Sequence, residues 1–222
     1  MPTRDPDHPT VAGDARRSLV DHARALVDER LIVGTAGNLS VAVDDGLLVT
    51  PSSLPYHEAP ADDMVLLGAD GSRLAGQRVP TSEWQLHLAV HAAHGPRAIV
   101  HTHAPCTTAV STLVTELPAI HYYVELLGGP PRVAPYATFG TAELAANVNE
   151  ALTSRSAVIM ANHGAVTTGA TLQEAADRAR TLEWLCEIYL RASAAGTPQL
   201  LTRAQLDDVD RRLEQLRRDL SA

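Results

Sequence analysis

The sequence predicts one α/β or α+β domain built around a single main sheet. Strand-like apolar runs and helical apolar patterns alternate irregularly along 222 residues, a length typical of one domain. No internal repeat interrupts them, and no apolar stretch approaches the roughly 20 residues needed to cross a bilayer. We therefore expect helices packed against one sheet and no membrane partner.

The N-terminal half predicts an arm, a helix and then a hairpin. Residues 1–13 are rich in proline and lack periodicity, so we expect a loose arm there. Apolar residues at helical spacing predict a helix over 14–31. The turn Asp44-Asp45-Gly46 between apolar runs is a hairpin signal. The expected strands are 39–43, 47–50 and 64–68.

The C-terminal half alternates helical and strand-like segments. Ser82 is a plausible N-cap of the first helix, and Gly95-Pro96 ends that helix. The expected helices are 82–93, 104–114, 141–154, 171–194 and a charged tail helix at 203–220. The expected strands are 98–102, 119–124, 133–137 and 157–162.

Composition excludes several classes of function. A net charge of −8 argues against general nucleic-acid binding, which needs a basic surface. All 18 basic residues are arginine, and the absence of lysine excludes Schiff-base, pyridoxal-phosphate and Walker A chemistry. The polar N-terminus and two separated cysteines, Cys106 and Cys186, indicate a reduced, cytoplasmic protein. Catalysis here would have to use a metal, carboxylates, histidine or tyrosine.

The most informative motif is His101-Thr102-His103, which follows a strand-like apolar run. In a strand, residues i and i+2 point to the same face, so these two imidazoles can chelate a metal. Asn162-His163-Gly164 follows another apolar run and supplies a third imidazole. Three histidine ligands leave one coordination position open, which is typical of catalytic zinc. The alternative is that all three are incidental polar residues at strand ends.

Two further features of the 82–93 helix have competing interpretations. Glu83 at its start is either an acid/base or fourth metal ligand, or simply a carboxylate favoured by the helix dipole. His87, His91 and His94 recur at helical spacing but without an HExxH motif. This row predicts a helix surface or a polar packing seam in preference to a metal site.

Three small-residue segments are candidates for holding a phosphate. The segments 34–40, 50–53 and 80–82 lie at element boundaries, where backbone N–H groups and hydroxyls are free. Each alone is an ordinary loop. Tyr122 and Tyr123 occupy the expected strand 119–124, so one is expected in the core, while the other could present a phenol as a proton donor.

Taken in order, these segments closely resemble the class II aldolase/adducin family, within it the L-fuculose-1-phosphate aldolase-like branch. The matching segments span roughly residues 14–195 and are GTAGNLS (34–40), TPSSLPY (50–56), PTSEWQLH (80–87), AIVHTHAP (98–105), AIHYYV (119–124), APYATFGTAEL (134–144) and ANHGAVTTG (161–169). The resemblance implies an α/β fold with a central, largely antiparallel sheet flanked by helices. It implies a catalytic domain at 14–202, followed by the charged helix at 203–222. It also implies a homotetramer with active sites at subunit interfaces.

The resemblance also assigns roles to residues. It implies a divalent metal, typically zinc, on His101, His103 and His163, with Glu83 as the acid/base that touches the metal at rest. It implies that Tyr122 reaches a neighbouring subunit's site and handles the proton on the C4 oxygen. The implied substrate-phosphate contacts are Thr35, Gly37, Asn38, Ser52, Ser53, Thr81 and Ser82. The implied reaction is cleavage of a ketose 1-phosphate, such as L-fuculose 1-phosphate, to dihydroxyacetone phosphate and a short aldehyde.

The sequence departs from the branch in ways that leave the aldehyde open. Ser52-Ser53 stands where the branch usually has Thr-Gly, and the tail after Tyr189 has no tyrosine. Thr81 stands where serine is common. Glu83 favours an aldolase over 4-epimerases, which typically have aspartate there. Dehydratases and decarboxylases of the same fold are alternatives, and a non-catalytic adducin-like module would lack these metal ligands.

Overall fold

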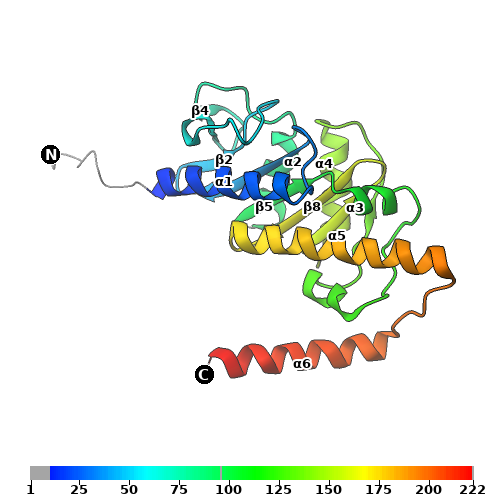
Figure 1. Ribbon diagram of the computed structural model, residues 1–222. Helices are drawn as coiled ribbons and strands as arrows, with labels where there is room; N and C mark the ends of the chain where they lie inside the picture. The colour runs from blue at the N-terminus through cyan, green and yellow to red at the C-terminus, as the bar shows by residue number, and fades with distance from the viewer. Residues whose placement is uncertain (1–10, 96, 222) are drawn as a thin grey trace.

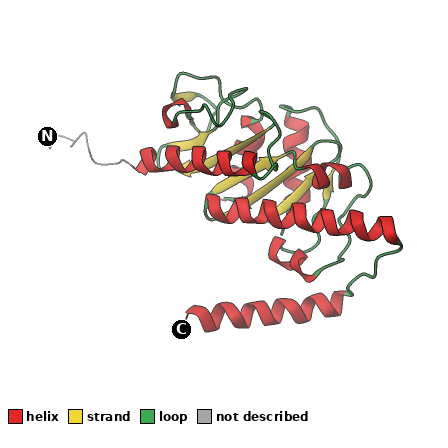
Figure 2. Ribbon diagram, in the orientation of Figure 1, coloured by secondary structure: helices red, strands yellow, loops and turns green. Residues whose placement is uncertain are grey.

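A mixed sheet organises the chain (Figures 1 and 2). The computed structural model describes residues 11–95 and 97–221, and within them eight strands lie in the order β4-β3-β2-β1-β5-β8-β7-β6. The strands are β1 (Gly37–Val43), β2 (Gly46–Val49), β3 (Val65–Leu67), β4 (Arg73–Ala75), β5 (Ala98–Thr102), β6 (Val133–Ala134), β7 (Ala157–Met160) and β8 (Gly164–Gly169). Every neighbouring pair is antiparallel except β6 and β7, which are parallel. The predicted largely antiparallel sheet is confirmed.

Helices cover both faces of this sheet. They are α1 (Val11–Asp28), α2 (Trp84–His94), α3 (Pro105–Val110), α4 (Ala142–Leu152), α5 (Leu172–Ala195) and α6 (Arg203–Ser221), with short 3-10 helices η1 (Ala61–Asp63) and η2 (Tyr122–Leu127). Helices α1 and α5 pack against one face, where Leu19 and Ala176 meet Val100 of β5. Helices α2 and α4 pack together on the other face, around Ile99 and Val166. Among the described helices, none combines the length and apolar character needed to cross a membrane.

The central strand β5 brings the candidate ligands to the middle of the sheet. Every residue of β5 is buried. Strand β1 pairs with β5 so that Asn38 lies opposite His101, and β8 pairs on the other side with Val166 opposite His101. The start of β1, the end of β5 and the start of β8 therefore lie side by side at one end of these central strands. Glu83, which precedes α2, lies next to them and accepts a hydrogen bond from Asn38.

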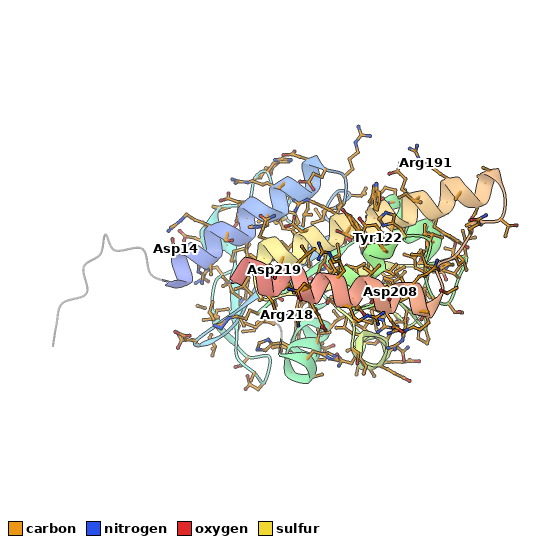
Figure 3. The ribbon with its side chains drawn as sticks, turned by 90° about the horizontal axis from the view of Figure 1, so that it is seen from below. Asp14, Tyr122, Arg191, Asp208, Arg218 and Asp219 are labelled. Atoms are coloured by element: carbon orange, nitrogen blue, oxygen red, sulfur yellow. The ribbon has the colours of Figure 1, made fainter. Side chains whose placement is uncertain are left out.

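The C-terminal helix α6 lies apart from the sheet (Figure 1). Its early residue Leu206 is buried in the core that also contains Leu127 of η2. Farther along, its exposed surface carries charged side chains, among them Asp208, Arg218 and Asp219 in Figure 3. The helix predicted at 203–220 is confirmed as a charged element attached mainly through η2.

Several predicted boundaries are wrong at the N-terminus and around residue 110. Helix α1 begins at Val11, so residues 11–13 belong to a helix and not to a loose arm. Residues 1–10 of that expected arm lie outside the described residues. The helix expected at 104–114 ends at Val110. The helix expected from Ser82 begins at Trp84, with Glu83 as its N-cap residue.

The strand predicted at 119–124 is also wrong. Its second half is the 3-10 helix η2, and the side chain of its N-cap residue His121 accepts a hydrogen bond from the Tyr123 backbone N–H. Tyr122 and Tyr123 are 44% and 36% exposed, so neither ring lies in the core. The apolar and aromatic residues of this segment favour a strand, but the local cap closes a turn instead.

The strands that sequence patterns missed are short or rich in small residues. Strand β8 contains glycine at both ends, and β4 is a three-residue edge strand whose residues are all exposed. The segment predicted at 133–137 forms only the two-residue strand β6, and the strand predicted at 157–162 ends at Met160. These elements gain their order from pairing with neighbours and not from a local apolar pattern.

Candidate metal centre and active site

Three histidine rings converge at the edge of the sheet where β5 ends. The ring centroids of His101, His103 and His163 are 4.7, 5.0 and 4.8 Å apart, a nearly equilateral triangle. His103 lies just beyond β5, before α3, and Glu183 of α5 accepts the first N–H groups of that helix from Cys106 and Thr107 at 2.8 and 2.7 Å. This carboxylate anchors the start of α3, and therefore the turn that carries His103.

The Asn162-His163-Gly164 turn places the third ring. Asn162 has φ +54°, a left-handed conformation that asparagine tolerates better than most residues. A Cβ on Gly164 would lie 2.2 Å from the Thr102 carbonyl oxygen. Glycine there lets β8 approach β5 at the residue between the two chelating histidines. In this motif Asn162 forms the turn, His163 is the candidate ligand, and Gly164 allows the close backbone contact.

The proton positions leave nitrogen lone pairs facing one another. His101 Nδ1 lies 2.9 Å from the Ala165 carbonyl oxygen, which can only accept, so Nδ1 carries the proton. His101 Nε2 lies 2.9 Å from His103 Nε2 and 3.0 Å from a Glu83 oxygen. In the neutral ring, the Nε2 lone pair is free to bind a cation, and the Nδ1 hydrogen bond is the outer contact usual for metal-binding histidines.

Glu83 completes the cluster. Its Oε2 accepts a hydrogen bond from Asn38 Nδ2 at 3.0 Å, while its buried Oε1 has no hydrogen-bond partner in the described structure. His163 Nε2 lies 3.5 Å from that oxygen. Ligand atoms of Glu83, His101, His103 and His163 all lie within 4.8 Å of one another, so this cluster can hold one metal ion. An orphaned carboxylate oxygen beside converging nitrogens fits a cation.

The electrostatics of the cluster favour an anionic carboxylate. Burial alone raises the pKa of the Glu83 carboxyl, but the charge and hydrogen bond of His101, together with the Asn38 hydrogen bond, hold that pKa well below its usual value. Burial lowers the pKa of His101, and the neighbouring Glu83 charge outweighs burial and raises it. Burial and the His101 and His163 charges lower the pKa of His103 to about 4. An anionic Glu83 carboxylate beside the ring nitrogens favours a cation at this point.

A cavity of about 370 Å³ opens above the cluster. All seven residues expected to contact a phosphate line it: Thr35, Gly37, Asn38, Ser52, Ser53, Thr81 and Ser82. Among the described residues, the backbone N–H groups of Ser53 and Ser82 make no hydrogen bond to another backbone group. Ser82 also lies one residue before Glu83, the N-cap of α2, near the helix N-terminus where the dipole favours an anion. Free amides, hydroxyls and a helix N-terminus in one cavity fit a phosphate.

Ser53 adopts a conformation that glycine prefers. Its φ is +57°, in the left-handed region, which costs a non-glycine residue of the order of 1 kcal/mol. The aldolase-like branch resembled by this sequence usually has glycine at this position. The loop therefore keeps the backbone geometry of a glycine while adding a hydroxyl to the cavity lining.

Tyr122 does not line the cavity of its own chain. It belongs instead to a surface cluster of rings in which His121 stacks on Tyr122 at 4.4 Å and contacts Tyr123 and Trp184 at 4.7 and 4.9 Å. Figure 3 shows Tyr122 on the side of the molecule along which α6 runs. Tyr122 is therefore exposed on the surface of its own chain, and its contact with a neighbouring subunit's site stays a prediction.

Sequence reasoning missed two aromatic residues in the cavity lining. Tyr136 and Phe139 line the cavity beside His103 and His163, yet they are 63% and 62% exposed. The only signal was their occurrence in the loop APYATFG, without an apolar period that would bury them. The helical row behaves as a packing seam at His87, which is fully buried, and as surface at His94.

Comparison with known proteins identifies the family. The model of the class II aldolase and adducin N-terminal domain matches residues 17–190. The chain belongs to the class II aldolase and adducin family. A family member from Rhodospirillum rubrum, 5-methylthioribulose-1-phosphate/5-deoxyribulose-1-phosphate aldolase, is 40% identical over 91% of this chain and 90% of its own length. The L-fuculose phosphate aldolase of Escherichia coli K12 is 38% identical over 82% of this chain and 85% of its own.

Solved structures agree with the family assignment. The structure of an L-fuculose 1-phosphate aldolase superposes with a TM-score of 0.87 at 33% identity, covering 90% of this chain and 96% of that one. The antiparallel sheet flanked by helices is therefore the class II aldolase fold. These relatives are aldolases that act on sugar phosphates by name, which supports a lyase.

Proposed function

We propose that the protein is a metal-dependent aldolase that cleaves the C3–C4 bond of a ketose 1-phosphate to give dihydroxyacetone phosphate and a short aldehyde. One observation carries the proposal. A single cavity combines a histidine and glutamate cluster able to hold a cation with unpaired amides and hydroxyls suited to a phosphate. The names of the relatives point to the same reaction class.

We assign zinc to the cluster, with His101, His103 and His163 as ligands and Glu83 as the fourth contact at rest. Neutral imidazoles and a carboxylate suit this ion, and the chain has no lysine for an iminium alternative. When bound, the ion would act as a Lewis acid that stabilises negative charge on substrate oxygens. Metal analysis of the purified protein should find about one divalent ion per chain.

The protein's own residues hold the substrate and move one proton. The hydroxyls and free amides around Ser53 and Ser82 bind the phosphate, which fixes C3 near Glu83. The C4 hydroxyl loses its proton as the aldehyde carbonyl forms, and the electron pair of the C3–C4 bond stays on C3 as an enediolate. Glu83, after taking up one proton, delivers that proton to C3. Tyr136 and Phe139 in the lining favour an aldehyde with an apolar end and limit water at the cleaved bond.

The proposal includes a homotetramer in which Tyr122 serves the cavity of a neighbouring copy, where it accepts the C4 hydroxyl proton during cleavage and returns it in the reverse, condensation direction. The support is its absence from its own cavity lining and its place in an exposed aromatic cluster, which is common at protein interfaces. Light scattering should report four chains. Mixing inactive Tyr122→Phe and Glu83→Gln subunits should restore activity, because hybrid assemblies contain sites with both native residues. No recovery after subunit exchange would remove Tyr122 from that role.

The substrate is tested by a cleavage panel. L-fuculose 1-phosphate, 5-deoxyribulose 1-phosphate and 5-methylthioribulose 1-phosphate all give dihydroxyacetone phosphate on C3–C4 cleavage, so one coupled assay compares them. A 4-epimerase assay on ribulose 5-phosphate is run in parallel. Release of dihydroxyacetone phosphate supports the aldolase, whereas epimerisation alone would replace it. We also place the enzyme in the cytoplasm, where its charged substrates are retained, and cell fractionation tests that location.

A further inference from the structure

A chain of buried hydrogen bonds leads from Glu83 through Asn38 and His87 to Ser40. His87 follows Glu83 by four residues on α2 and is fully buried. Its Nε2 lies 2.5 Å from Asn38 Oδ1, and its Nδ1 lies 2.7 Å from Ser40 Oγ on β1. Asn38 Nδ2 in turn donates to Glu83 Oε2 at 3.0 Å. Four side chains from two elements therefore form one continuous path.

Donor and acceptor chemistry allows only one direction along this path. The Glu83 carboxylate can only accept, so Asn38 must present its amide nitrogen to it and its Oδ1 to His87. Because Oδ1 also can only accept, His87 Nε2 must carry the proton. The remaining Nδ1 of a neutral ring is an acceptor, and the Ser40 hydroxyl donates to it.

The surroundings keep the His87 ring in the form that this direction needs. Burial, followed by the charge of His101, lowers the pKa of His87 to about 3, so the ring is neutral near pH 7. A neutral ring has one donor and one acceptor, which matches its two partners. In a protonated ring Nδ1 would also be a donor, so the Ser40 hydroxyl would have to accept from it instead of donating to it.

We propose that His87, supported by Ser40, is a positioning residue that fixes the amide of Asn38 so that its N–H group faces the carboxylate of Glu83. An amide free to rotate would also place Oδ1 against Oε2, and two acceptors in contact repel. The path thus sets the orientation of Glu83 without touching substrate. This role rests on the proposed function, because it matters for turnover only if Glu83 moves the proton.

The first experiment separates positioning from packing. His87→Gln retains an N–H donor near the Nε2 position, whereas His87→Phe keeps an aromatic ring and removes both hydrogen bonds. Without His87 the Asn38 amide can turn away and its hydrogen bond to the charged Glu83 carboxylate is weakened or lost, so we expect kcat to be at least about tenfold lower for His87→Phe and within about threefold of wild type for His87→Gln. His94→Gln, at the exposed end of the same helix, is the matched control and should be unchanged.

Ser40→Ala tests the direction of the path. If Ser40 acts only through His87, the double variant Ser40→Ala/His87→Phe should have the same kcat as His87→Phe alone. If the two residues act independently, the fold-losses in kcat of the two single variants should multiply in the double variant. Metal content is measured for every variant and should stay at the wild-type level. Equal loss of kcat in the glutamine and phenylalanine variants, or no loss in either, would overturn the positioning role.

A second experiment needs no activity. Nitrogen-15 spectra of protein with labelled histidine, assigned by the signal missing in His87→Gln, report which ring nitrogen carries the proton. We expect His87 protonated at Nε2 in wild type, and in Ser40→Ala we expect the Nδ1 signal to shift toward that of a nitrogen without a hydrogen bond. Protonation at Nδ1 would overturn the path even if the variants fold poorly. If wild type cleaves no ketose phosphate while this tautomer is found, the proposed function fails and the hydrogen-bonded path stands.

Discussion

Two sets of three histidines in this chain have opposite fates. His101, His103 and His163 come from strand ends and a turn, and their rings meet within 5.0 Å of one another. The second set, His87, His91 and His94, lies on one helix, and none of its members belongs to the cluster of metal-ligand atoms found in the described residues. His87 is buried with both nitrogens hydrogen-bonded, while His94 is exposed.

The difference shows what side-chain spacing can and cannot decide. Regular spacing on a helix puts side chains on one face, but that face passes from the sheet interior at His87 to the surface at His94. Strand ends, in contrast, bring together residues that are far apart in the sequence, because neighbouring strands end at the same side of the sheet. A metal cluster needs atoms that converge, and here backbone pairing of β5 with β8 supplies that convergence.

The largest effect should come from removing one ring of the converging set. His103→Ala leaves two imidazoles and a carboxylate, so metal affinity should fall more than about 100-fold and cleavage activity should be lost. His94→Ala, the counterpart in the helical set, should keep its metal and its activity. Metal analysis after dialysis checks both. Equal metal content in the two variants would break the comparison.

Glu83→Gln should separate metal binding from proton transfer within the converging set. Glutamine has nearly the same shape and retains the three imidazoles, so the metal should stay bound while kcat falls about 10²- to 10⁴-fold. Steady-state kinetics and metal content are measured on the same preparation. Turnover at the wild-type rate would remove Glu83 from its acid/base role.

The third prediction concerns Ser53, which lines the cavity on the side proposed to bind the substrate phosphate. Ser53→Ala and Ser53→Gly both remove the hydroxyl, so KM should rise about tenfold in each with kcat little changed. Because Ser53 has φ +57°, the glycine variant should be more stable than the alanine variant by about 1 kcal/mol. Kinetics and denaturant unfolding report the two effects. A rise in KM confined to the glycine variant would show that the backbone, not the hydroxyl, matters.

The last prediction concerns the stability of the metal-free protein in acid. His87 has a pKa lowered from 6.5 to about 3, so between these values the unfolded chain binds a proton that the folded chain does not. The free energy of unfolding should therefore fall as pH falls below about 6.5, by up to about 1.4 kcal/mol per unit from this group. His87→Gln should flatten this dependence, and His94→Gln should not. Identical slopes in all three proteins would contradict the buried, neutral ring.

Much of the framework was predictable because local rules match the final structure. The strand 98–102 and the hairpin around Asp44-Asp45-Gly46 were predicted correctly, since apolar runs bounded by turn residues are sufficient signals. The strand predicted at 119–124 was wrong because a local histidine cap outweighed the strand preference of its aromatic and β-branched residues. Strand β8, made largely of small residues, has no local signal and depends on its neighbours.

The sequence by itself determined the class of chemistry. The absence of lysine excludes iminium chemistry, while three histidines at strand ends favour a metal site and the hydroxyl-rich loops favour a phosphate site. Only the tertiary structure decided which atoms meet. The orphaned oxygen of Glu83, the opposed nitrogens of His101 and His103, and the path from Ser40 through His87 all arise from contacts between distant segments. Such contacts depend on sheet register and helix packing, which no local pattern specifies.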